Sequence, residues 1–415
     1  MNLLDKSAQN KITPDAILTY SVAATERIKQ IGAEAVTNAT VGVFQDENGV
    51  LKTNDAVEEA LRAVPFTLGA NYAPTEGVHG FIDAVIDNVL RSHRPAGTFI
   101  GGIATPGGTG ALHNVFMNYT GPGDTAITTD SCWGNYKKML HEIGREFATF
   151  NTFKADGGFD TDACLALCRQ VAAGQTNVPL ILNSPAHNPT GFAVSDAEWD
   201  VLIAGLTDIA ENGRNNVILI ADTAYIDYAG DAGRCFFEKF TGLPENFLVA
   251  VCASASKGFT LYGYRLGVTF CIAQSEAVCE QFVGAAKSSA RGTWSSCNHV
   301  PMEAVAAIVG DADKLAALRR QQDEFSAIMA ERAALFSTEA AACGLRIFPY
   351  VSGFFIYVPA PDHETAVAVY EVLTKDNIYV VPLGSGLRVA ICAIGLNKVA
   401  GLAGKIKAAC DTVMN

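Results

Sequence analysis

The sequence predicts an α/β protein with a mostly parallel central sheet in a large domain, plus a smaller α+β domain. Three observations lead to this prediction: a length of 415 residues, short apolar runs that alternate with helical patterns, and a change of pattern after Gly310. A single core stops growing at roughly 250–300 residues, so two domains are expected. We expect the large domain to cover residues 50–312 and the small domain to combine residues 1–49 with 313–415.

The large domain is expected to consist of short apolar strands separated by helices. The predicted strands are Thr125–Thr129, Val178–Leu182, Val217–Ala221, Phe247–Ala253 and Gly267–Ile272. Between the second and third of these runs, Asp196–Glu211 carries apolar residues at helical spacing. Buried strands that alternate with helices are typical of a largely parallel sheet covered by helices.

The small domain begins with a long helical pattern. Asp311–Ala342 reads as one amphipathic helix, and Gly344 suits its C-terminal end. The elements predicted after it are a strand at Gly353–Val358, a helix near Glu364–Thr374, a pair of strands at Ile378–Val381 and Leu387–Ala393, and a final helix. The first fifty or so residues are expected to join this domain.

Composition and charge exclude several classes of protein. Apolar residues make up 49% of the chain, charged residues 18%, and the net charge is −13, which disfavours nucleic acid and anionic membranes as partners. We find no apolar run long enough to span a membrane and no secretory signal. The eleven cysteines are scattered without a Cys-x-x-Cys pair, so we expect buried, reduced thiols in a cytoplasmic protein and no metal site.

Polar side chains follow four of the predicted strands, at the point where each strand ends. They are Asp130, Cys132 and Trp133; Asn183 and His187–Gly191; Asp222 and Tyr225; and Ser254, Ser256 and Lys257. Ligands of open α/β sheets bind beyond the carboxyl ends of the strands. One such group is typical of a loop, whereas four in succession indicate a shared crevice.

The glycine-rich stretch Thr105–Leu112 precedes a helical pattern. Free backbone N–H groups at the start of a helix bind phosphate, and glycine allows a close approach. A plain tight turn is the alternative interpretation. The stretch has neither the Lys-Ser/Thr pair of a P-loop nor the Gly-x-Gly-x-x-Gly order of a dinucleotide site.

Lys257 follows a run of apolar and small residues, where a lysine is either the first solvated residue of a loop or a reactive amine. An ordinary lysine, with a pKa near ~10.4, is protonated and non-nucleophilic. Burial or a neighbouring cation lowers that pKa and favours Schiff-base formation. Arg265, eight residues further on, would supply such a cation and a phosphate clamp.

In their order along the chain, these segments resemble the class I aminotransferases of fold type I, especially the aspartate and aromatic amino-acid aminotransferase branch. The similarity runs from about Asn71 to Arg388 and is most specific between Ser254–Lys257 and Arg265–Gly267. The other similar blocks are Gly107–Leu112, His187–Gly191 and Asp222–Tyr225. The resemblance implies pyridoxal 5′-phosphate as cofactor, ping-pong transfer of an amino group between an L-amino acid and a 2-oxo acid, and a homodimer with shared active sites.

The resemblance also implies a role for each matching residue. Lys257 would hold the cofactor as a Schiff base and move the substrate proton, Asp222 would pair with the pyridinium nitrogen, and Tyr225 would bond the phenolate oxygen. The implied cofactor-binding residues are Gly108, Thr109, Trp133, Asn188, Asp222, Tyr225, Ser254, Lys257, Arg265 and, from the other subunit, Tyr72.

For the substrate, the resemblance implies that Arg388 clamps the α-carboxylate, near Asn188 and Thr40. Arg291 falls where the family carries an arginine for a distal carboxylate, and a plain interface arginine is the alternative. The chain departs from the aspartate-enzyme pattern at Thr40, Tyr136, Asn183, Thr260 and Trp294. These departures leave both dicarboxylic and aromatic donors open.

Three other functions compete with transamination. A β-lyase or decarboxylase would use the same Lys257, Asp222 and Arg388. A non-catalytic regulatory domain is disfavoured because the chain has no added basic module. A nucleotide enzyme is disfavoured because the P-loop lysine is missing.

Overall fold

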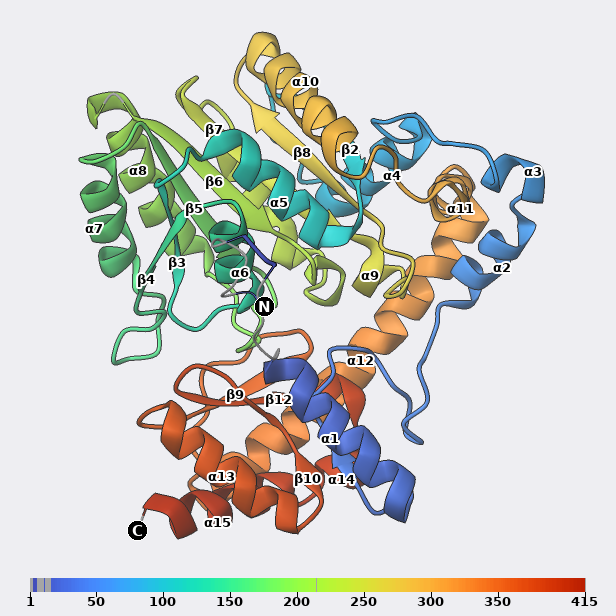
Figure 1. Cartoon of the computed structure of the whole chain (residues 1–415), viewed down its shortest axis with the longest axis vertical. Helices are drawn as coiled ribbons and strands as arrows, with labels where there is room; N and C mark the ends of the chain where they lie inside the picture. Colours follow the sequence, from blue (N-terminus) through green and yellow to red (C-terminus); the bar gives the residue numbers. More distant parts are fainter. Residues whose placement is uncertain (1–2, 6–10, 12–15, 214, 415) are drawn as a thin grey trace. The chain divides into compact units, whose positions relative to one another are not determined.

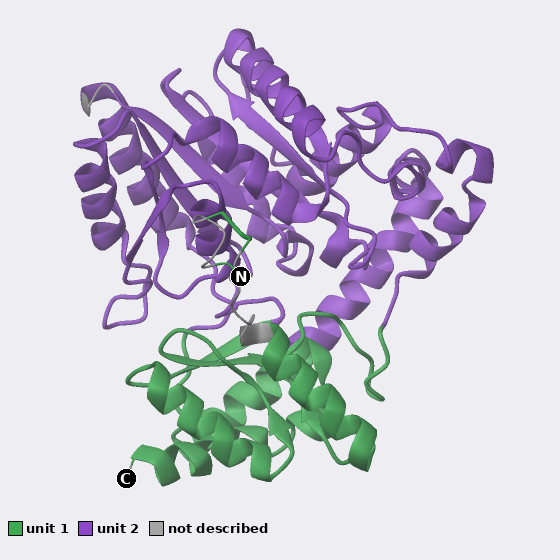
Figure 2. Ribbon diagram, in the orientation of Figure 1, with its two compact units in different colours: residues 1–51, 331–348, 355–415 green, residues 52–330, 349–354 purple. Residues whose placement is uncertain are grey.

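The computed structural model describes residues 3–5, 11, 16–213 and 215–414, whose helices and strands are joined by loops (Figure 1). The chain divides into two compact units (Figure 2). Unit 1 comprises Met1–Leu51, Glu331–Phe348 and Phe355–Asn415, and unit 2 comprises Lys52–Ala330 and Pro349–Phe354. Each unit is built from segments that are distant in the sequence.

Unit 2 contains a seven-stranded sheet in the order β2-β8-β7-β6-β5-β3-β4. Its strands are β2 (Phe99–Thr105), β3 (Thr125–Thr129), β4 (Glu146–Phe150), β5 (Asn177–Asn183), β6 (Asn216–Asp222), β7 (Phe247–Ser254) and β8 (Gly267–Ala273). β8 runs antiparallel to both of its neighbours, and the remaining strands run parallel to one another. The prediction of a mostly parallel sheet is therefore confirmed.

Helices cover both faces of this sheet. They are α2 (Asp55–Ala63), α3 (Phe66–Gly69), α4 (His79–Leu90), α5 (Gly107–Tyr119), α6 (Asn135–Glu142), α7 (Thr161–Ala172), α8 (Asp196–Gly213), η2 (Ile226–Tyr228), η3 (Ala232–Phe240), α9 (Ala255–Gly258), α10 (Glu276–Thr293) and α11 (His299–Val309). Along β6, Val217, Leu219 and Ala221 belong to one buried cluster, whereas Ile218 and Ile220 belong to another. The first cluster includes residues of α4, α7, α8 and α11, and the second includes residues of α5, α6 and α10. This alternation shows that both faces of the sheet are buried, which explains the continuous apolar runs in the sequence.

Unit 1 is an α+β assembly. Its strands form a three-stranded antiparallel sheet, β11-β12-β9, and a parallel pair, β1-β10. The strands are β1 (Thr37–Asn38), β9 (Phe355–Pro359), β10 (Ile378–Tyr379), β11 (Val381–Pro382) and β12 (Gly386–Ala390). The helices are α1 (Ala16–Ile31), the part of α12 (Ala312–Cys343) from Glu331 onward, α13 (His363–Lys375), η4 (Ile391–Ala393), α14 (Leu396–Val399) and α15 (Leu402–Met414).

The strand predicted at Gly353–Val358 is observed as β9 at Phe355–Pro359, and the other two predicted strands of the small domain are interrupted or shortened. The strand predicted at Ile378–Val381 is interrupted at Val380, because β10 pairs with β1 whereas β11 pairs with β12. The strand predicted at Leu387–Ala393 ends at Ala390, and its last three residues form the 3-10 helix η4. The backbone changes hydrogen-bonding partners at both places, which a continuous apolar run does not reveal.

Strand β2 was not predicted, because two glycines interrupt its apolar pattern. Gly102 is required there: an added Cβ would lie 2.4 Å from the Thr269 carbonyl oxygen and 2.6 Å from the Phe270 Cβ of β8. Strand β4, at the edge of the sheet, was also missed because its sequence is partly polar. No helix in the residues that the structure describes has the length and apolar character needed to cross a membrane.

Candidate active site

Lys257 lies in the short helix α9, directly after strand β7. The Ser254 hydroxyl caps this helix and accepts a hydrogen bond from the Ser256 backbone N–H at 3.2 Å. The Lys257 carbonyl oxygen accepts hydrogen bonds from the Tyr228 hydroxyl at 3.3 Å and from the Thr260 backbone N–H at 3.1 Å. These contacts fix the backbone from which the Lys257 side chain extends.

Three aromatic rings surround the amine of Lys257. Its Nζ lies 4.8 Å from the ring centre of Tyr262, 5.5 Å from that of Tyr225 and 5.6 Å from that of Phe354. Tyr225 was predicted from the sequence, whereas Tyr262 and Phe354 were not assigned to the site. Ring faces attract a cationic amine, and their apolar bodies limit the access of water to it.

Asp222, at the carboxyl end of β6, is a buried carboxylate with two hydrogen-bond donors. The Tyr136 hydroxyl donates to its Oδ2 at 2.5 Å, and the Ala224 backbone N–H donates to its Oδ1 at 3.1 Å. Burial raises the pKa of Asp222, while these two hydrogen bonds act to lower it. Burial and the nearby carboxylate raise the pKa of Tyr136 well above its usual value, so Tyr136 keeps its proton and acts as the donor.

A chain of hydrogen bonds links Asp222 to Tyr225 through two asparagines. The Asn183 side chain donates to the Asp222 carbonyl at 2.8 Å, and its Oδ1 accepts from the Asn188 backbone N–H at 2.7 Å. The Asn188 side chain in turn donates to the Tyr225 hydroxyl at 3.5 Å. Asn183 and Asp222 are the last residues of the neighbouring strands β5 and β6 and are paired in register, and Asn188 and Tyr225 follow these strands. The predicted grouping of Asp222, Asn188 and Tyr225 is thus present within one unit.

The glycines at the start of α5 lie against Arg265 and Ser254. A Cβ added to Gly107 would lie 2.6 Å from Arg265 Nη2, and one added to Gly108 would lie 3.3 Å from the Ser254 Cβ. Helix α5 has 13 residues, and Thr109 lies in its first turn. A helix N-terminus with an arginine and a serine beside it is suited to a phosphate group.

Trp133 and His187 lie near the same edge of the sheet. Trp133 packs edge-on against Tyr136, with ring centres 5.6 Å apart. His187 is buried and its Nδ1 lies 2.8 Å from the Thr190 hydroxyl. Burial lowers the pKa of His187 to about 4, so this ring is neutral at pH 7 and supports the loop structurally.

Tyr72 and Arg291 do not join these groups within the single chain. The Tyr72 side chain is 89% exposed. Arg291, in the last turn of α10, is exposed and donates to the Ser295 hydroxyl at 2.6 Å.

Arg388 and Thr40 lie together in unit 1. Both residues are buried, and Arg388 Nη2 donates to the Thr40 carbonyl at 2.9 Å. The guanidinium carbon of Arg388 lies 4.3 Å from the ring centre of Phe355. A buried guanidinium that is oriented in this way is suited to hold a carboxylate.

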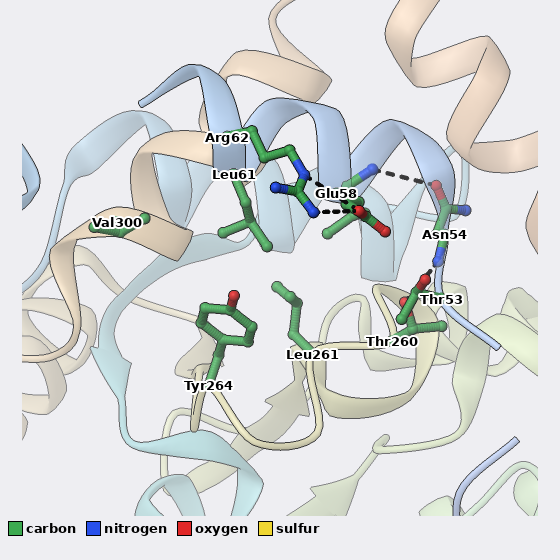
Figure 3. A pocket seen from close by; sticks show the side chains of 10 residues that line it. Thr53, Asn54, Glu58, Leu61, Arg62, Thr260, Leu261, Tyr264 and Val300 are labelled. Carbon is green, nitrogen blue, oxygen red and sulfur yellow. Dashed lines mark hydrogen bonds and ion pairs between the residues drawn. The ribbon is translucent and has the colours of Figure 1, made fainter. Parts of the chain in front are cut away.

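A pocket of about 330 Å³ lies beside the loop that follows Lys257 (Figure 3). Ten residues line it: Thr53, Asn54, Val57, Glu58, Leu61, Arg62, Thr260, Leu261, Tyr264 and Val300. The Asn54 backbone N–H donates to the Thr260 hydroxyl at 2.9 Å, which ties this loop to the segment before α2. None of the predicted catalytic, cofactor-binding or substrate-binding residues is among these ten.

Comparison with known proteins yields consistent matches. A family model described as aminotransferase class I and II matches residues 34–406. The aromatic-amino-acid aminotransferase of Escherichia coli (strain K12) is 26% identical over 403 residues, which covers 92% of this chain and 94% of that protein. The crystal structure of an aminotransferase from Anaerococcus prevotii is 33% identical, with a TM-score of 0.94 and coverage of 98% of this chain and 99% of that chain. An aromatic-amino-acid aminotransferase from Burkholderia pseudomallei, covalently bound to pyridoxal phosphate, shares the fold with a TM-score of 0.76 at 22% identity, over 98% of this chain and 100% of that chain.

Proposed function

Because the chain belongs to the class I and II aminotransferase family, we propose that it is a pyridoxal 5′-phosphate-dependent aminotransferase whose cofactor is held by Lys257. The observation that carries this proposal is the Lys257 amine beside Tyr225, on the same edge of the sheet as the buried carboxylate of Asp222. The reaction moves an amino group between an L-amino acid and a 2-oxo acid, and dicarboxylic and aromatic donors are the proposed substrates.

The residues at this edge fit each functional part of that cofactor. The α5 N-terminus with Ser254 and Arg265 would hold the phosphate, because a Cβ at Gly107 would occupy space next to the Arg265 guanidinium. Asp222 would hold a proton on the ring nitrogen, since a cation at this buried carboxylate compensates the cost of its ionisation. The Tyr225 hydroxyl and the Asn188 amide would bind the phenolate oxygen.

The bound cofactor supplies an electron-accepting ring, and the chain supplies orientation and proton transfer. Lys257 would attach the cofactor through Nζ and, once released, carry the proton of the substrate α-carbon. The rings of Tyr225, Tyr262 and Phe354 restrict water around this amine. Trp133 would stack on the ring of the cofactor.

Substrate binding is proposed to depend on Arg388, with Thr40 and Asn188 beside the α-carboxylate. The support is the buried Arg388 guanidinium, which the Thr40 carbonyl and the Phe355 ring orient. Arg291 is proposed to bind the distal carboxylate of acidic donors. Its exposed position at the end of α10 agrees with a residue that acts across a subunit interface.

A homodimer with shared active sites is part of the proposal. Tyr72, which is highly exposed in the single chain, is proposed to reach the cofactor phosphate of the other subunit. The cytoplasmic location expected from the sequence stays a prediction.

Borohydride reduction followed by peptide mass mapping tests the proposed function. We expect reduced cofactor on Lys257 and loss of transamination in Lys257→Ala. A matched control is Lys239→Ala, because Lys239 is also half-buried but forms ion pairs with Asp196 at 3.0 Å and Asp200 at 2.6 Å, two residues of α8. Attachment to a different lysine would disprove the assignment, and release of ammonia without an acceptor 2-oxo acid would indicate lyase chemistry instead.

A panel of Asp, Glu, Phe, Tyr and Ala with 2-oxoglutarate as acceptor tests substrate choice. Arg291→Ala should reduce kcat/KM for the acidic donors by roughly tenfold or more, because charge-assisted hydrogen bonds contribute about 1.5–3 kcal/mol. The aromatic donors should change little. An equal loss for every donor would contradict a specificity role for Arg291.

A further inference from the structure

A buried carboxylate lies directly against the turn that carries Lys257. Asp227, in η2, has its Oδ2 1.7 Å and its Cγ 2.5 Å from the place where a Cβ on Gly258 would lie. Side-chain Cβ atoms are essentially never found within 3.0 Å of such atoms. Position 258, the neighbour of Lys257, therefore accommodates no side chain while Asp227 is in place.

Two donors from different elements hold Asp227 in this position. Arg234 Nη2 donates to Asp227 Oδ1 at 2.9 Å, and the side-chain amide of Asn88 donates to the same oxygen at 3.0 Å. The Arg234 side chain is itself fixed by the carbonyl oxygens of Val89, at 3.1 Å, and Gly230, at 2.5 Å. The carboxylate thus belongs to a rigid network that joins α4, η2 and η3.

The burial of this charged network costs desolvation free energy. The Arg234 and Asp227 side chains are 0% and 7% exposed, and burial lowers the pKa of the Arg234 guanidinium. A buried ion pair carries a large desolvation cost, and apolar residues of similar volume often stabilise a protein as well or better. A role in fixing one particular geometry is the alternative reason to keep such a pair.

Two further side chains also hold this turn. The Gln322 side chain, from α12, donates to the Gly258 carbonyl at 2.8 Å and is itself buried. The Tyr228 hydroxyl, one residue after Asp227, donates to the Lys257 carbonyl at 3.3 Å. Gly258 is therefore in contact with both Asp227 and Gln322, and a shift of either contact would move the Lys257 backbone.

We propose that Asp227 is a positioning residue: held by Arg234 and Asn88 against Gly258, it sets the place of the turn from which Lys257 reaches its cofactor. This inference rests on the proposed function of Lys257. It assigns no contact between Asp227 and the cofactor or the substrate. Asp227 acts through the backbone of Gly258.

A double-mutant cycle with Gly258→Ala, Asp227→Gly and the combined variant tests the proposal. The matched control is Gly263→Ala, because Gly263 lies in the same loop and an added Cβ there would meet no atom within 4 Å. For each folded protein, two quantities are measured: the rate at which pyridoxal phosphate attaches to Lys257 of the apo-protein, and the pH midpoint of the visible absorbance of the attached cofactor. Circular dichroism and thermal melting establish that the fold is retained.

We expect each single change to slow attachment by roughly tenfold or more, because small displacements of a reacting group have effects of that order or larger. The pH midpoint should move in both single variants and stay at the wild-type value in Gly263→Ala. Adding Gly258→Ala to Asp227→Gly should cause little further loss, because the carboxylate that the new methyl group would meet is gone.

The proposal would be overturned if either folded single variant kept the wild-type attachment rate and the wild-type pH midpoint. The test therefore needs only one of the two single variants to fold. Strictly multiplicative losses in the combined variant would also overturn it, since they would show that positions 227 and 258 act independently. Failure of the proposed function looks different: the wild-type protein itself would then attach no cofactor at Lys257.

Discussion

Tyr136 is the side chain that most directly controls the charge of Asp222. Removal of its hydroxyl in Tyr136→Phe eliminates the 2.5 Å hydrogen bond to Asp222 Oδ2, which favours the ionised carboxylate. The pKa of Asp222 should therefore rise further, and the acidic limb of the kcat/KM profile should move to higher pH. Because a hydrogen bond to a charged group contributes about 1.5–3 kcal/mol, the shift should be about one pH unit or more.

The control for this experiment is Tyr119→Phe. Tyr119 is a partly buried tyrosine of α5 that packs on the same buried cluster as Tyr136 and stacks on Phe282 at 5.8 Å. The donors to the Asp222 carboxylate are Tyr136 and Ala224, so loss of the Tyr119 hydroxyl removes neither hydrogen bond. An acidic limb that stays in place in Tyr136→Phe would show that the Tyr136 hydroxyl does not set the charge of Asp222.

Because burial lowers the pKa of His187, the stability of the protein should depend on pH. This pKa is about 4 in the folded chain and near 6.5 when unfolded, so the unfolded chain binds more protons between these values. The free energy of unfolding should be fully retained above pH 6.5 and should fall as the pH is lowered toward 4, by on the order of 3 kcal/mol from this residue. Urea unfolding across this range, with His187→Gln as comparison, measures the contribution; parallel curves for the two proteins would contradict it.

At Gly102, strand β2 lies too close to β8 for a side chain to fit between them. In Gly102→Ala the new methyl group would meet the Thr269 carbonyl oxygen and the Phe270 Cβ, so the two strands must separate. Overpacking of this kind typically costs about 1–3 kcal/mol of unfolding free energy. The exposed Gly284→Ala in α10, where a Cβ would meet nothing within 4 Å, should be neutral or stabilising by up to about 1 kcal/mol. Equal unfolding midpoints for the two variants would refute the close approach.

The strands that were predicted from the sequence are those buried on both faces. Val217–Ala221 and Phe247–Ala253 are continuous apolar runs because each of their faces packs against helices, and both lie inside observed strands. The glycines of β2 and the edge position of β4 leave no such run. The change of partner at Val380 depends on two different sheets, which is information that a local pattern does not contain.

The residues of the candidate site also divide into those that the sequence revealed and those that required the structure. Lys257, Asp222, Asn188, Tyr225 and Ser254 were accessible from the sequence because each belongs to a polar segment at or just after the end of a strand. Phe354 and Asp227 were not, because their roles depend on contacts between segments that are distant in the chain. Tyr136 was recognised as a departure from the family pattern, but its hydrogen bond to Asp222 required the structure.

The proposed role of Tyr72 connects cofactor binding with the assembly of the subunits. The exposed Tyr72 side chain is proposed to bind the cofactor phosphate of another subunit, so dimerisation and cofactor affinity should be linked. Tyr72→Ala should weaken pyridoxal phosphate binding by roughly tenfold, as expected for the loss of a hydrogen bond to a charged group, while the dimer persists in sedimentation equilibrium. Unchanged affinity in a dimeric Tyr72→Ala protein would contradict the shared site.

The reversed direction of β8 has a consequence for how this protein tolerates changes of chain length. Because β8 returns along β7, with Gly267 opposite Ser254, the chain leaves and re-enters the same edge of the sheet within a dozen residues. Lys257 and Arg265 therefore lie in one short connection between β7 and β8, and every residue inserted between them would change the distance that the proposed cofactor spans. A library of single-codon insertions should consequently be depleted of functional clones between Ser256 and Leu266, while the exposed turn near Gly242 should accept them freely.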